Sequence, residues 1–128
     1  MNRILAILVL LLGALVAPLA VHAQATVSGT FYVGNAVAQA STARIFLATP
    51  SEYNVIIQCA QSHSTAAPCL QSTPPSYEAN IRSNGRFAFN VPDGREYVLI
   101  GLRRSDGHIT TMELDVMGSV DQTLFMDF

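Results

Sequence analysis

The stretch that decides the fold is YEANIRSNGRFAFNVPDGREYVLIGLRRSDGHITTMELDV, residues 77–116. Apolar and polar residues alternate in it over four runs, and a period of two is typical of β-strands with one buried face. The runs are separated by the turn sequences SNG, PDG and SDG, in which glycine accepts the positive φ of a tight reversal. The third run contains YVLIGL, which is apolar at every position. This predicts a strand that is central in its sheet.

Further strands are expected on both sides of this stretch. Residues 26–33, 43–48 and 123–128 alternate in the same way, and the consecutive apolar residues within 53–58 are interpreted as a buried strand. The segment 59–76 contains three prolines and no periodicity, so we expect a long irregular connection. Because no helical period is recognised, the predicted fold is all-β: a seven- to eight-stranded antiparallel β-sandwich.

The first 23 residues have the pattern of a secretory signal peptide. A short cationic start precedes an apolar run over residues 4–20, and the small residue Ala23 offers a cleavage site. The alternative is an uncleaved membrane anchor, because the run is close to the lower length for spanning a bilayer. Pro18 favours cleavage, since proline interrupts a helix. We therefore expect a signal peptide over 1–23 and an exported domain over 24–128, periplasmic or secreted, with no membrane span after signal cleavage.

The charge of the expected mature domain is weakly negative. Without Arg3, six arginines stand against nine acidic residues, which gives a net charge of −3 with histidine neutral. The chain contains no lysine, and its arginines form no basic run. A nucleic-acid-binding domain needs a basic surface that neutralises phosphates. No nucleic acid is therefore expected among the partners.

Two cysteines, Cys59 and Cys69, lie ten positions apart in the proline-containing segment. In an exported chain with an even number of cysteines, a disulfide is the usual state. The alternative is a metal site, because His63 lies between the two thiols in the sequence. Two thiols and one imidazole leave a fourth ligand without a candidate, however, and an oxidising compartment removes the thiolates. We therefore predict a Cys59–Cys69 disulfide, no metal and no cofactor.

The turns of the 77–116 stretch also resemble those of a known family. The pattern is a polar turn ending in glycine, a strand of the form x-Phe-x-Phe, a Pro/Asp-Gly turn, and a strand with tyrosine followed by apolar residues. The matching positions are Gly85, Phe87, Phe89, Pro92, Gly94 and Tyr97. Together with ARIFLA at 43–48, they resemble the carboxypeptidase regulatory-like domain, an accessory module of exported proteins. The resemblance implies a transthyretin-like or immunoglobulin-like sandwich, and it departs over 49–76. It carries fold and not function, because the motifs are structural.

No arrangement of residues typical of catalysis is recognised. The expected mature domain has two histidines, His63 and His108, and neither is paired in the sequence with a nucleophile and an orienting group. Glu113 and Asp115 lie on one polar strand face, and the other aspartates near them belong to turns. A transthyretin-like hydrolase is the least favoured alternative, because its histidine and arginine set is not found. The chain is therefore predicted not to be an enzyme, and no catalytic residues are assigned.

A binding or interaction role in the cell envelope or outside the cell is predicted instead, because exported sandwiches often bind through loops. The candidate binding residues are Tyr53, His63, Tyr77, Arg103 and Arg104. The partner is expected to be a protein or a carbohydrate, and the final strand offers an edge for a protein partner. A carbohydrate-binding, starch-binding-like module is the alternative, although the chain has no tryptophan for a flat sugar platform.

Overall fold

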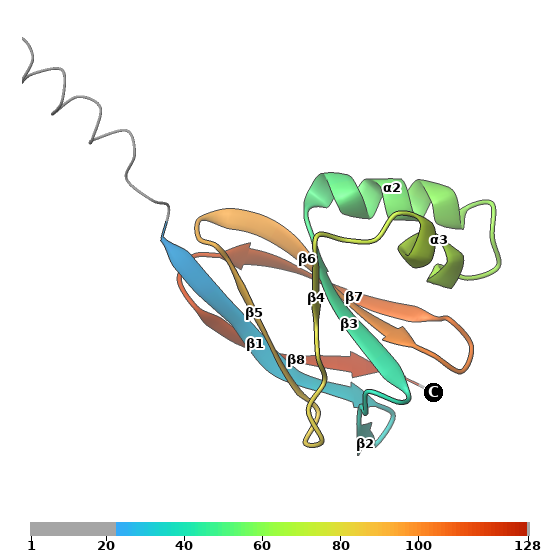
Figure 1. Ribbon diagram of the computed structural model, residues 1–128, viewed down its shortest axis with the longest axis horizontal. Coiled ribbons are helices and arrows are strands. Elements are labelled where there is room, and N and C mark those ends of the chain that lie inside the picture. The colour runs from blue at the N-terminus through green and yellow to red at the C-terminus, as the bar shows by residue number, and fades with distance from the viewer. Residues whose placement is uncertain (1–22, 128) are drawn as a thin grey trace, which may run out of the picture.

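The computed structural model describes residues 23–127, which form two four-stranded β-sheets packed face to face (Figure 1). Sheet A consists of β1 (Gln24–Val33), β2 (Ala36–Val37), β5 (Arg86–Pro92) and β8 (Val120–Met126). Sheet B consists of β3 (Ala43–Ala48), β4 (Tyr77–Ala79), β6 (Arg95–Arg103) and β7 (Ile109–Val116). The predicted all-β sandwich is confirmed. The predicted signal peptide lies outside the described residues, apart from Ala23.

The strand order shows one departure from a purely antiparallel sandwich. In sheet A, β1 pairs antiparallel with β2 and β5 but parallel with β8, so that Val27 lies opposite both Phe89 and Val120. A parallel pair needs a long connection, and here the whole intervening chain provides it. Sheet B has the order β4-β3-β6-β7, and all its pairs are antiparallel. The prediction that the apolar strand is central is confirmed for β6.

The three predicted turns form, and each contains a glycine at positive φ: Gly85 at 79°, Gly94 at 71° and Gly107 at 73°. The main core lies between the sheets, where Phe31 packs so closely on β6 that a Cβ at Gly101 would come within 2.5 Å of its ring. The side chains of this core come from both sheets and include Val27, Phe31, Ile45, Leu47, Phe87, Phe89, Val91, Leu99 and Leu124. The alternation in the sequence therefore corresponds to one buried face per strand.

The predicted strand over 53–58 is wrong, because these residues belong to helix α2 (Pro50–Ala60). A capping box starts the helix: the Thr49 hydroxyl accepts from the Glu52 amide at 3.3 Å, and the Glu52 carboxylate accepts from the Thr49 amide at 2.8 Å. Pro50 stands in the first turn, where its missing N–H costs nothing. Ile56 is fully buried, whereas the exposed fraction of Val55 is 48%. The consecutive apolar residues thus point to different sides of a helix.

The segment predicted as an irregular connection contains a second helix, α3 (Ala67–Ser72). Figure 1 shows α2 and α3 together over the outer face of sheet B. They enclose a second core, which consists of Phe46, Ala48, Ile56, Cys69, Leu70, Val98, Ile100 and Leu102. Sheet B is therefore covered on both faces, which is the physical reason for the continuous apolar run of β6. Within residues 23–127, the helices are too short and too polar for any of them to cross a membrane.

Candidate functional site

A groove of about 430 Å³ lies between the start of α2 and the outer face of β6 and β7. We call it the acidic groove. Its lining residues are Pro50, Tyr53 and Asn54 from α2, Glu96, Tyr97 and Val98 from β6, and Glu113, Leu114 and Asp115 from β7. The groove forms because α2 packs over β3 and β6 and leaves the neighbouring part of β7 open. It is the place where the helical cover of sheet B ends.

Three carboxylates lie side by side in the acidic groove. Glu96 is directly opposite Asp115 in the β6–β7 pair, and Glu113 is opposite Val98. Alternate residues of a strand share a face, so all three carboxylates lie on the face to which Val98 belongs, the face toward the helices. All three are exposed. Like charges directly opposite in an antiparallel pair are destabilising, so this cluster is held at a cost to stability.

Ion pairs elsewhere on the surface use other carboxylates. In the part of the chain that the structure describes, the arginine pairs are Arg44–Glu78 at 2.7 Å, Arg86–Asp121 at 2.8 Å and Arg103–Asp106 at 2.5 Å. None of the ion pairs between residues 23 and 127 includes Glu96, Glu113 or Asp115. The negative charge of the acidic groove is therefore not neutralised by the domain itself.

The three groove carboxylates are not needed to cap the N-terminus of α2, because other residues already cap it. Glu52 and Thr49 satisfy the first amides of the helix. Burial raises the pKa of Glu52, but hydrogen bonds from the Ser76 hydroxyl at 2.6 Å and from Thr49 outweigh burial and leave the pKa below its ordinary value. Glu52 is thus an ionised cap outside the set of groove-lining residues. The N-terminus of α2 therefore has its acceptors and its negative charge without the groove carboxylates.

Tyr53 is the predicted candidate that lies in the acidic groove. It is half-buried, and its side chain packs against the second core while it lines the groove. An aromatic ring beside carboxylates is suited to an ammonium or guanidinium group, because the ring face and the carboxylates both attract a cation. Asn54 adds an amide to the same wall. The arrangement can therefore hold a basic side chain.

Tyr77, the second predicted tyrosine, has a structural position in β4. Its ring packs edge-on against Tyr97 with 6.3 Å between the ring centres, and it is half-buried against the main core. The Tyr97 hydroxyl donates to the Pro92 carbonyl at 3.0 Å, and burial raises the pKa of Tyr97. The two tyrosines thus fill the edge of the main core, on the opposite side of sheet B from Tyr53.

Arg103 and Arg104 lie together at the other end of the sandwich, beside a hollow of about 400 Å³. The Arg103 guanidinium donates to the Asp106 carboxylate and to the Asp127 carbonyl, at 2.5 Å and 2.9 Å. Its hydrogen bond holds the pKa of Asp106 well below its usual range. Arg104 donates through Nε to the Ala40 carbonyl at 3.0 Å. Arg103 thus ties neighbouring segments to β6, and Arg104 joins the turn after β6 to the loop before β3.

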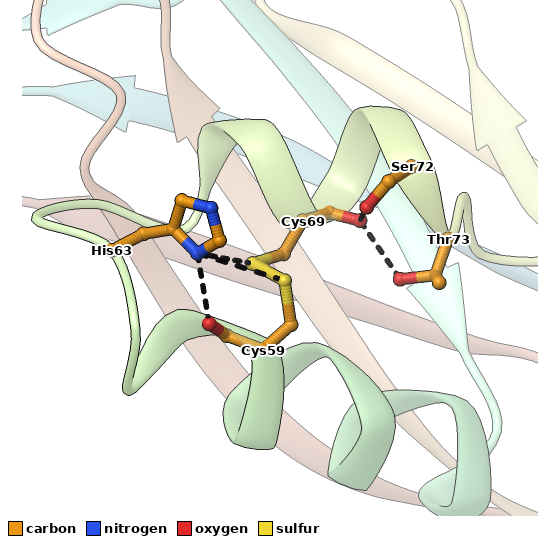
Figure 2. The surroundings of a disulfide bond; sticks show 5 residues. All are labelled: Cys59, His63, Cys69, Ser72 and Thr73. Atoms are coloured by element: carbon orange, nitrogen blue, oxygen red, sulfur yellow. Dashed lines mark hydrogen bonds between the residues drawn. A yellow bond between two sulfur atoms is a disulfide. The ribbon is translucent and has the colours of Figure 1, made fainter.

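The predicted Cys59–Cys69 disulfide is confirmed, and it joins the end of α2 to α3 (Figure 2). His63 is exposed, and its Nδ1 lies 3.0 Å from the Cys59 carbonyl oxygen. The five predicted candidates are thus spread over separate parts of the surface and core, with Tyr53 alone among them in the acidic groove.

Tyr53 is the one groove residue that the sequence reasoning named as a candidate, and the amide and carboxylate residues that it missed are Asn54, Glu96, Glu113 and Asp115. The shared polar face of Glu113 and Asp115 was recognised in the sequence. What was missing was Glu96 opposite them and the helix above them. The capping box TPSE at 49–52 was the signal that would have placed the helix there.

Comparison with known proteins gives no match, neither to a family model nor to a curated protein. The resemblance to the carboxypeptidase regulatory-like domain therefore stays a prediction. The function has to be inferred from the geometry of the chain itself.

Proposed function

We propose that this chain is an exported, non-catalytic binding module whose acidic groove holds a basic segment of a protein partner. The observation that carries the proposal is the directly opposed pair Glu96 and Asp115, with Glu113 beside it and no basic partner among residues 23–127. Such a cluster lowers the stability of the free domain, and a bound cation relieves that cost. The ligand is thus selected by charge.

The size and walls of the acidic groove support a side chain rather than a free ion as the ligand. A groove of about 430 Å³ is large enough for an arginine or lysine together with part of its backbone. The Tyr53 ring gives that side chain an aromatic surface, which is worth about 0.5–1 kcal/mol at an exposed site. Arginine fits best, because its planar guanidinium can contact the ring and a carboxylate together.

The positions of the histidines support a non-catalytic role. His63 lies against the Cys59 carbonyl, and His108 pairs with Asp106 at 2.9 Å. Among the described residues, neither histidine has a serine or threonine hydroxyl as its hydrogen-bond partner. A nucleophile activated by a base needs that contact. Binding is therefore the better-supported activity for the domain.

The test uses short fluorescent peptides rich in arginine, with glycine–serine and glutamate-rich peptides as controls, and measures binding by fluorescence anisotropy. We expect only the arginine-rich peptide to bind, more weakly as the salt concentration rises, because salt screens exposed charges. The double variant Glu96→Gln/Asp115→Asn should weaken binding about tenfold, at roughly 0.5–1 kcal/mol for each exposed charge pair.

The matched control for this double variant is Asp127→Asn, which removes a carboxylate from the far end of the sandwich. Tyr53→Ala should weaken binding by the smaller amount expected for one aromatic contact. Asp127→Asn removes one charge and the double variant removes two, so a loss of binding free energy in the Asp127 variant that is half the loss in the double variant would show that only net charge matters, and the groove would not be the site.

A carbohydrate ligand is the second candidate function, and the outer face of sheet A favours it. Phe125 is 62% exposed there and stacks on Tyr32 with 5.3 Å between the ring centres. Hydroxyls of Thr30 and Thr123 lie in register beside this pair. Aromatic rings next to hydroxyl groups suit a sugar. Binding to an unbranched glucan that Phe125→Ala abolishes, and that the groove variants leave unchanged, would support this candidate.

A further inference from the structure

Two sulfur atoms and one imidazole nitrogen meet at the junction of α2 and α3. Figure 2 shows the His63 ring turned toward the disulfide, with its Nδ1 at 3.9 Å from the Cys59 sulfur and 3.8 Å from the Cys69 sulfur. The three donor atoms all lie within 4.8 Å of one another. His63 is exposed, Cys59 is half-buried and Cys69 is buried, so the cluster opens to solvent on the His63 side.

Besides the disulfide, apolar side chains of both helices pack against sheet B. Ile56 of α2 and Leu70 of α3 are both buried in the second core against sheet B. The last turn of α3 is closed by Thr73, whose amide and hydroxyl donate to the Cys69 carbonyl at 2.9 Å and 2.8 Å. We therefore expect the two cysteines to stay close together when the sulfur–sulfur bond is broken. Their thiols stay within reach of His63.

From this arrangement we propose that the reduced domain binds one Cu(I) ion through Cys59, Cys69 and His63. Two thiolates and an imidazole are soft to intermediate donors, and thiolate ligands favour Cu(I) and Zn²⁺ among the biological metals. Cu(I) is satisfied by three ligands. Zn²⁺ takes four, and because the donor cluster contains no fourth histidine, cysteine or carboxylate from the described residues, water would have to complete its shell. The donor set therefore favours Cu(I) over Zn²⁺.

The chemistry requires a reductant, which we take to be a dithiol. The dithiol transfers two electrons and two protons to the Cys59–Cys69 bond, so that two thiols form and the dithiol becomes a cyclic disulfide. Cu(I) then displaces both thiol protons and bonds to the two sulfur atoms. His63 gives up its contact with the Cys59 carbonyl and presents an unprotonated Nδ1, with its proton on Nε2.

The experiment titrates Cu(I) without oxygen into protein that was reduced with dithiothreitol and desalted, in competition with the coloured chelator bicinchoninate. We expect one Cu(I) per chain for the reduced protein and none for the disulfide form. His63→Ala should weaken binding by at least about tenfold, since even an outer-shell ligand change costs that much. His108→Ala, which changes the other described histidine, should leave the affinity unchanged.

Far-ultraviolet circular dichroism of the reduced, metal-free protein checks that the helices persist. Loss of the helical signal on reduction would overturn the proposal, because the ligands would then not be preorganised. Failure to compete with bicinchoninate, or equal weakening in the His63 and His108 variants, would overturn it as well. Binding of Zn²⁺ at one equivalent with no Cu(I) binding would contradict the assignment of the metal.

Discussion

The outer faces of the two sheets differ in what they present to their surroundings. Sheet B presents apolar side chains such as Phe46, Val98 and Ile100, and two helices cover them. Sheet A presents the hydroxyls of Thr26, Ser28 and Thr30, which are partly exposed and hydrogen-bond to neighbouring strands or receive hydrogen bonds from them. The difference teaches that the helices are part of the core of sheet B and not an appendage. The acidic groove lies where this cover ends.

The largest difference in stability between the two faces is expected when an apolar side chain is removed from beneath the helices. Ile56→Ala should lower the free energy of unfolding by about 2–5 kcal/mol, because it leaves a cavity between α2 and sheet B. On sheet A, Phe125→Ala should cost about 1.5 kcal/mol at most, since only the stack on Tyr32 is lost. Urea unfolding followed by circular dichroism measures both. Equal losses would mean that the helices do not contribute to a core.

Removing the disulfide tests whether α2 and α3 stay packed on sheet B without it. Cys59→Ser/Cys69→Ser should lower the free energy of unfolding by roughly 3 kcal/mol, through greater freedom of the unfolded chain. The double variant should nevertheless keep its helical content, because Ile56 and Leu70 anchor the helices. Circular dichroism before the unfolding transition checks the second point. A variant that loses its helical signal would show that the disulfide, and not the packing, holds the cover.

Removing the N-terminal cap of α2 should have a smaller effect on the free energy of unfolding. Thr49→Ala should lower the free energy of unfolding by about 1 kcal/mol, because the hydroxyl that accepts from the Glu52 amide is lost. Thr123→Ala on the exposed face of β8 should change it by no more than about 0.5 kcal/mol. The pKa of Glu52 is lowered in the folded state, so the stability from this carboxylate is present above its unfolded pKa and is lost as the pH falls through the folded pKa. Glu52→Gln should therefore cost more stability near neutral pH than in acid, and a pH-independent cost would contradict the role of Glu52.

Most of the sandwich could be predicted from the sequence because each strand is amphipathic by itself. The alternation of Phe87, Phe89 and Val91 and the glycine turns on either side of them are local signals. The parallel pairing of β1 with β8 has no such signal, since it depends on where the whole chain returns. The short strand β2 is likewise set by one turn at Gly34 and two pairs of residues.

The acidic groove was beyond the sequence reasoning because it depends on α2. Apolar residues at 55–57 are consecutive, so they match a buried strand as well as a helix, and length alone did not separate the two. The helical spacing of Tyr53, Ile56 and Ala60, which share the second core, becomes decisive only together with the capping box. Once 50–60 is a helix, its first turns lie beside Glu96 and Asp115, and the acidic groove forms between them.

The smallest predicted effect is a gain in stability, whereas the other variants lose stability. Glu96→Gln should raise the free energy of unfolding by about 0.2–1 kcal/mol, because it removes a like charge directly opposite Asp115. The counterpart on sheet A, Asp121→Asn, should lower stability, since it breaks the pair with Arg86, whose hydrogen bond holds the pKa of Asp121 below its ordinary value. Urea unfolding at low salt, near neutral pH, measures both. A stabilised Glu96 variant that also loses the arginine-rich peptide would mean that the domain keeps this carboxylate for binding and not for folding. A destabilised one would mean that Glu96 has a favourable partner within the domain, and the basis for the acidic groove as a cation site would be gone.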